Sequence, residues 1–194
     1  MSFFRIFSGE AYKGTKDYLK TQKGYEILRT VLYFGISLSL FAAGFLTTGD
    51  RLNLLTVVAI LGCLPASKSA VSAVLFCRYK GLDEETAAQI EPHTGSLLTL
   101  YDMVFTGYDK TFVVEHMAVR GGRICGFATG KDFDRQAFYK HIDPLLKVDS
   151  FKNVDVRILQ DIHQYIRQLE ELQTVEGEEE LTCGIANTLK SVSL

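Results

Sequence analysis

The stretch "TVLYFGISLSLFAAGFLTTGDRLNLLTVVAILGCLPAS", residues 30–67, decides the architecture that the sequence predicts. Its first 19 residues and its last 16 contain no charged side chain, and only Gly49, Asp50 and Arg51 separate the two runs. A helix that crosses the hydrocarbon core of a bilayer needs roughly 20 apolar residues. We therefore predict two transmembrane helices, over about residues 28–48 and 52–76.

The charges on either side of this stretch predict its orientation. Because the link is so short, residues 28–80 are expected to form an antiparallel helical hairpin. Six Lys and Arg residues precede the first uncharged run, one lies in the link, and Arg78 and Lys80 follow the second helix. The positive-inside rule then puts both termini in the cytoplasm. The first apolar run begins after 29 residues and exceeds the core of a signal peptide, which favours a membrane helix.

Pro65 and Lys68 are the unusual residues of the second helix. In one continuous span, Lys68 would lie about 12 Å below the cytoplasmic end, and its side chain would extend toward the headgroups. Alternatively, the helix ends at Pro65 and residues 66–80 form a separate helix at the membrane surface. In a third interpretation, Lys68 belongs to a transport or sensing site formed by several copies of the chain.

Small residues recur at intervals of four on both predicted helices. Gly35, Ser39 and Ala43 form such a row on the first helix, and Gly62 and Ala66 begin one on the second. Small side chains at this spacing let helix backbones approach closely in lipid. The rows predict close packing, either inside the hairpin or between copies of the chain.

The rest of the chain predicts a small domain with helices and strands. Residues 1–27 are expected to be a basic, amphipathic segment on the cytoplasmic face of the membrane. Residues 81–175 follow the order helix, strand, strand, strand, helix, strand, helix, which suits a small α/β domain. An acidic break and a weak helix are expected over residues 176–194. The predicted class is a membrane-anchored α+β protein.

The clearest strand signal is a hairpin around Gly121 and Gly122. These two residues separate the β-rich runs "KTFVVEHMAVR" and "RICGFATG", and a glycine pair is typical of a two-residue hairpin turn. Alternation along the first run predicts one face with Phe112, Val114, His116 and Ala118.

In this element order, Glu115 lies on the second predicted strand and Lys131 follows the third. The order resembles that of the restriction-endonuclease-like core. The resemblance implies a metal-dependent phosphodiesterase site with an acid on the second strand and a Glu-x-Lys motif on the third. Glu115 would be the first acid, but the third strand, "RICGFATGK", carries no carboxylate. Asp102, Glu115 and Lys131 are the candidate catalytic residues.

Other chemical motifs are absent from the sequence. The spacing of the four cysteines predicts neither a disulfide framework nor a zinc site, and the four histidines form no metal-binding pair and are expected to be solvated or partly buried: Cys63, Cys77, Cys125, Cys183, His93, His116, His141 and His163. We therefore expect no metal, no cofactor and no nucleic-acid partner.

These observations predict an integral membrane protein whose cytoplasmic domain is a non-enzymatic binding, assembly or regulatory module. Its expected partners are the lipid bilayer and either another protein or a second copy of the chain. Two alternatives stay open. One is a membrane-tethered, metal-dependent hydrolase with a degenerate restriction-endonuclease-like core, and the other is a subunit of an oligomeric transport or sensing complex that uses Lys68.

Overall fold

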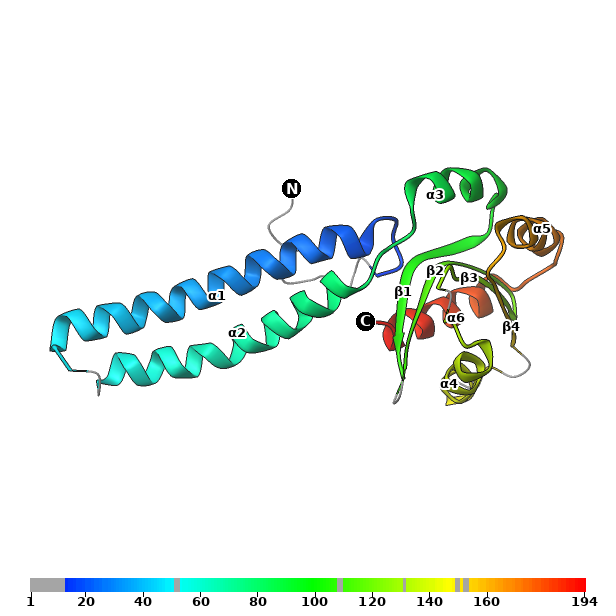
Figure 1. Cartoon of the computed structure of the whole chain (residues 1–194). Coiled ribbons are helices and arrows are strands. Elements are labelled where there is room, and N and C mark those ends of the chain that lie inside the picture. Colours follow the sequence, from blue (N-terminus) through cyan, green and yellow to red (C-terminus); the bar gives the residue numbers. More distant parts are fainter. Residues whose placement is uncertain (1–12, 51–52, 108–109, 131, 149–150, 152–153) are drawn as a thin grey trace. The chain divides into compact units, whose positions relative to one another are not determined.

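A computed structural model describes residues 13–50, 53–107, 110–130, 132–148, 151 and 154–194. In these residues it contains six α-helices, one 3-10 helix and a four-stranded sheet, so the predicted mixed α+β class is confirmed (Figure 1). The chain divides into two compact units. One comprises the described residues of Leu19–Lys80, and the other comprises those of Gly81–Leu194 together with residues 13–18.

The first unit consists of two long helices, α1 (Tyr18–Thr48) and α2 (Leu54–Arg78). Both are long and apolar enough to cross a membrane. α1 contains the span predicted over about residues 28–48 and begins ten residues before it, at Tyr18. Charged residues limit an apolar span, but Lys, Gln and Glu are good helix formers and continue the helix beyond it.

α2 is one continuous helix that contains Pro65 in its interior. The Asn53 side chain caps its first turn by accepting a hydrogen bond from the Thr56 amide at 2.8 Å. A proline in a helix removes one backbone hydrogen bond and leaves the other turns intact. The alternative in which the helix ends at Pro65 is therefore wrong.

α1 and α2 contact each other through a repeat of seven residues. The Thr30 and Ser69 hydroxyl oxygens are 2.9 Å apart. Seven residues further along α1, the Ser37 hydroxyl lies 2.6 Å from the position of a Cβ on Gly62, and seven further again, a Cβ on Gly44 would lie 2.9 Å from the Leu55 Cβ. The matching contacts on α2 recede by seven residues each time, as expected of antiparallel helices with a heptad spacing.

The second unit has the predicted element order, followed by one more helix. Its elements are α3 (Glu84–Ile90), η3 (Glu91–His93), β1 (Leu98–Thr106), β2 (Thr111–Arg120), β3 (Arg123–Phe127), α4 (Arg135–Val148), β4 (Asp155–Leu159), α5 (Ile162–Gln173) and α6 (Glu179–Val192). Aspartates begin three of the helices: Asp83 accepts from Glu85, Asp134 from Ala137 and Asp161 from Gln164. Such caps satisfy amides that have no partner inside the helix.

The four strands form one sheet in the order β1-β2-β3-β4. The first three are antiparallel neighbours, and the predicted hairpin joins β2 to β3 with Arg120 opposite Arg123. β4 is parallel to β3, and α4 provides the crossover that a parallel pair requires.

Helices cover both faces of the sheet (Figure 1). One core contains side chains from α4 and α6, and the other contains side chains from α3 and α5. The helix expected to be weak over residues 181–194 is α6, and it contributes Ile185 and Leu189, both fully buried, to the first core. The C-terminal segment is thus an integral part of this unit.

The outer edge of β1 is covered by two segments from the ends of the chain. The Tyr101 amide donates to the Gly14 carbonyl at 2.9 Å, and the Leu194 amide donates to the Val104 carbonyl at 2.8 Å. The Lys13 ammonium donates to the Ser193 carbonyl at 2.8 Å, so the two segments are also linked to each other. An uncovered edge strand would be able to pair with another chain, and these contacts prevent that.

Candidate functional site

The candidate acids Asp102 and Glu115 occupy facing positions on β1 and β2. The pairs Tyr101–His116 and Met103–Val114 flank them in the register of the sheet. Asp102 itself has a positive φ of 55°, and the regular pairing is interrupted there. The two carboxyl groups therefore come from neighbouring strands at an irregular point of the sheet.

Asp102 holds the backbone where the chain enters this unit. Its side chain is only 4% exposed and accepts a hydrogen bond from the Leu82 amide at 2.7 Å. A Cβ on Gly81 would lie 2.6 Å from each carboxylate oxygen, so only glycine fits beside it. A positive φ is uncommon for residues other than glycine, although Asp tolerates it better than most. The conformation lets the carboxylate reach this backbone.

Glu115 is also buried, and its carboxylate is held by one residue. The Thr129 amide donates to it at 3.0 Å and the Thr129 hydroxyl at 2.6 Å. Burial raises the pKa of Glu115 above its usual value, and the nearby charge of Asp102 acts in the same direction, whereas the two Thr129 hydrogen bonds oppose the rise. A carboxyl group in this setting retains a proton more readily than a solvated one does.

The two acids form an incomplete version of the site that the sequence resemblance implies. β3 contributes no carboxylate beside them, and Lys131 lies outside the described residues. In the described parts of the chain, no group of three or more His, Cys, Asp or Glu is placed to hold a metal ion. Hydrogen bonds from Leu82 and Thr129 favour a structural role for both acids.

For His116, the expectation of a solvated or partly buried histidine is wrong. This residue is fully buried, and its Nδ1 lies 2.6 Å from the hydroxyl of Tyr165 on α5, while Nε2 has no hydrogen-bond partner. Its ring packs edge-on against Tyr101, with 4.6 Å between the ring centroids. Desolvation lowers the pKa of His116 to about 4, so the imidazole is neutral at pH 7.

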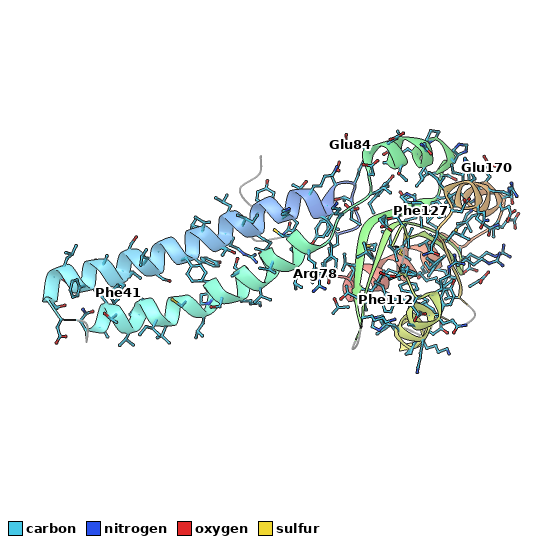
Figure 2. All side chains as sticks on the ribbon, viewed as in Figure 1. Phe41, Arg78, Glu84, Phe112, Phe127 and Glu170 are labelled. Atoms are coloured by element: carbon cyan, nitrogen blue, oxygen red, sulfur yellow. The ribbon has the colours of Figure 1, made fainter. Side chains whose placement is uncertain are left out.

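The predicted face of β2 is wrong beyond Val114. Phe112 and Val114 point into the core beneath α4 and α6, whereas Ala118 belongs to the opposite core, beneath α3 and α5. Figure 2 shows Phe112 on β2 and Phe127 on β3, which belong to these two opposite cores. The alternation changes phase at Glu115 and His116, opposite the positive φ of Asp102, and no strict period of two could predict this.

A second buried polar cluster lies between α1 and α2. Glu26 is 4% exposed, and its carboxylate lies 2.5 Å from the Arg29 guanidinium. Arg29 also donates to the hydroxyl of Ser69, which is 1% exposed, at 3.2 Å. Sequence reasoning counted Arg29 only as a charge that flanks a membrane helix. The signal it missed is that Glu26 and Arg29 are one helical turn apart and share a face.

Lys68 lies next to this cluster but points away from it. Its neighbours Ser69 and Ala66 are buried, whereas Lys68 and Pro65 are exposed. In the register of the two helices, Lys68 lies level with Val31, close to the Arg29 end of the uncharged run. Lys68 thus marks the end of the uncharged part of α2, as Arg29 does on α1.

The two rows of small residues have different environments. On α2, Gly62 and Ala66 face α1, and Ala66 is fully buried. On α1, Gly35, Ser39 and Ala43 are exposed, and no atom lies within 4 Å of a Cβ built on Gly35. The row on α1 is therefore not the surface that contacts α2, and packing between copies of the chain stays a prediction for it.

A pocket of about 330 Å³ in the second unit lies beside β2 and α6. Its lining includes Ser96, Arg120 and Cys183. The Arg120 guanidinium is already bound, because it donates to the Val175 carbonyl at 2.6 Å and to the Ser96 hydroxyl at 3.1 Å. All four cysteines of the chain, including Cys183, are free thiols.

The chain matches no protein-family model, no curated protein and no solved structure.

Proposed function

We propose that the chain is an integral membrane protein in which α1 and α2 form an antiparallel hairpin across the bilayer. The observation that carries this proposal is the location of exposed apolar groups. Among the described residues, every exposed large apolar side chain lies between Ile27 and Val74, and Phe41 in Figure 2 is one of them. So large an exposed apolar surface is typical of contact with lipid.

Burial argues against the alternative that these are core helices of a soluble protein. Only 11% of the apolar window of α1 and 17% of that of α2 is buried, whereas a core helix would be covered on most sides. The second unit has its own two cores on the faces of its sheet. The two long helices therefore need an apolar environment around them, and the first unit contains no other element that supplies it in the described residues.

The register of the two helices supports the same conclusion. It aligns the uncharged residues of α1, 30–48, with the uncharged residues of α2, 54–67, so that Arg29 and Lys68 lie at one end and Asp50 at the other. Nineteen helical residues span about 28 Å, close to the roughly 30 Å of the hydrocarbon core. In this proposal Lys68 lies at the membrane boundary, whereas a span that continues to Phe76 would put it about 12 Å deeper.

The α/β unit acts, in this proposal, as a cytoplasmic binding, assembly or regulatory module without catalytic activity. The support is the state of its buried polar groups. Asp102 and Glu115 bind backbone amides, and His116 pairs with Tyr165 inside a core. These groups stabilise the fold, which leaves the solvent-exposed surface to act on a partner.

Fractionation and thiol labelling of the full chain test the anchor and its orientation. The chain should stay in the membrane pellet after alkaline carbonate extraction. An impermeant maleimide should label an Asp50→Cys variant in intact cells, but should reach Cys183, which is exposed on α6, only after permeabilisation. Release by carbonate would overturn the anchor, and labelling of Cys183 in intact cells would overturn the orientation.

A membrane-tethered, metal-dependent hydrolase is the second candidate function. It is favoured by one observation, the facing positions of Asp102 and Glu115. Calorimetric titration of the full chain in detergent with Mg²⁺ and Mn²⁺ separates the two proposals. The binding-module proposal expects no saturable heat, whereas a hydrolase should bind metal and lose that binding in a Glu115→Gln variant that remains folded.

A further inference from the structure

The exposed charge at the Arg29 end of α1 and α2 is entirely basic in the described residues. Lys20, Lys23, Lys68 and Arg78 are all exposed, and Arg78 is the last residue of α2 (Figure 2). The sequence Leu19–Lys80 contains only two acids. Glu26 is buried and paired with Arg29, and Asp50 lies in the link at the opposite end.

Arg29 is paired with Glu26 inside the unit, so the positive charge that faces outward comes from the other basic residues. Because Glu26 neutralises Arg29 between the helices, Arg29 adds little to the charge that faces outward. Lys68 projects from the other side of α2, at the boundary of the uncharged run. Beyond it, Lys20 and Lys23 in the first turns of α1 and Arg78 in the last turn of α2 extend the same charge.

Residues 81–194, in contrast, carry a net negative charge. They contain 11 Lys and Arg against 19 Asp and Glu, a net charge of −8. An anionic membrane surface repels this part of the protein and attracts the basic end of the helices. Selectivity for an anionic surface therefore resides in the helices.

We propose that Lys68, together with Lys23 and Arg78, binds the phosphate groups of anionic phospholipids at the cytoplasmic boundary of the helix pair. The inference rests on the proposed membrane insertion and names the lipid partner of that anchor. A lysine at this level keeps its alkyl chain in the apolar layer and its ammonium among the headgroups. A basic side chain near an anionic leaflet contributes about 1 kcal/mol, equivalent to roughly a fivefold preference.

Native mass spectrometry of the full chain tests this inference. The detergent-solubilised protein is mixed with equal amounts of phosphatidylglycerol and phosphatidylcholine, and the ratio of the two bound lipids is measured. The wild-type chain should retain phosphatidylglycerol preferentially. Lys68→Gln should lower that preference by about fivefold, whereas Lys68→Arg should preserve it.

Lys140→Gln is the matched control, because Lys140 is also an exposed lysine and lies on α4. This variant should keep the wild-type lipid ratio. An equal affinity of the wild-type chain for both lipids, or an unchanged ratio in Lys68→Gln, would overturn the inference. Carbonate extraction of the same variants distinguishes the lipid site from the membrane anchor. A chain that stays in the membrane but shows no lipid preference refutes the lipid site and leaves the proposed anchor intact.

Discussion

The buried polar residues Asp102, Glu115 and His116 of the α/β unit are each paired with a neighbour in the fold. Asp102 supports the chain at Gly81 and Leu82, Glu115 binds Thr129, and His116 meets Tyr165. Each of these contacts satisfies a polar group that would otherwise be costly to bury. The exception is Nε2 of His116, which has no partner. Among these residues, we therefore expect His116 to be the one that makes the stability of the unit most sensitive to pH.

We expect His116 to make the folded protein sensitive to acid. Its pKa is about 4 in the folded state, below the ordinary value of 6.5, so the unfolded chain binds a proton more readily. Stability from this group is therefore complete above pH 6.5 and falls as the pH drops toward 4, by at most about 3 kcal/mol. Urea unfolding of the full chain in detergent at several pH values from 7 to 4 measures this loss.

The comparison with His116→Gln isolates the contribution of the histidine. Glu115 acts in the opposite direction, because its raised pKa favours the folded state as the pH falls. Both chains contain Glu115, so the difference between their pH profiles reports on His116. The variant should lose stability less steeply between pH 6.5 and 4. His163→Gln, at an exposed position of α5, should follow the wild-type profile, and identical profiles for His116→Gln and the wild type would contradict the prediction.

At the scale of elements, the sequence predicts those helices and turns that depend on residues close together in the chain. The glycine-linked hairpin and the two long apolar helices both follow from neighbouring residues. Features that depend on tertiary contacts were not predictable. The row on α1 from Gly35 to Ala43 has the same spacing as the one on α2, but Ser37 and Gly44 are the buried residues of that region. Only the contact between the helices distinguishes these two faces.

Gly62 and Gly35 should therefore differ in their tolerance of a large side chain. Gly62→Leu should weaken the pairing of α1 and α2, because even a Cβ there lies 2.6 Å from the Ser37 hydroxyl. Gly35→Leu should leave the pairing unchanged, since nothing lies within 4 Å of its Cβ position. The readout is disulfide formation between Thr30→Cys and Ser69→Cys, whose wild-type hydroxyl oxygens are 2.9 Å apart.

The cross-linking is done in membranes, with the four native cysteines replaced by alanine. Thiols that remain free after mild oxidation are counted by their reaction with maleimide-polyethylene glycol. Gly62→Leu should leave several times more free thiol than the parent chain, and Gly35→Leu should match the parent. Equal cross-linking in the two glycine variants would show that Gly62 does not lie in the contact between the helices.

At the scale of the whole molecule, the α/β unit is assembled from two separate parts of the sequence. Residues 13–18 belong to it, although α1 and α2 separate them from residue 81 in the chain. Two consecutive residues of β1 receive these parts: Tyr101 donates to the Gly14 carbonyl, and Asp102 accepts from the Leu82 amide. The segment before α1 thus stabilises a unit whose main part lies after α2.

Gly14 tests this arrangement, because replacement by alanine should destabilise the α/β unit from a distant point of the sequence. Gly14 has a φ of 77°, and a Cβ there would lie 2.9 Å from Leu100 Cδ2. We expect Gly14→Ala to lower the free energy of unfolding of the full chain by about 1–2 kcal/mol. Gly24→Ala is the control, because Gly24 lies inside α1 with nothing within 4 Å of its Cβ position, and alanine there should stabilise the helix by up to about 1 kcal/mol. Urea unfolding in detergent, followed by the fluorescence of the buried tyrosines, should therefore shift in opposite directions for the two variants. An unchanged or raised free energy of unfolding in Gly14→Ala would mean that the Gly14 segment contributes nothing to the stability of the sheet.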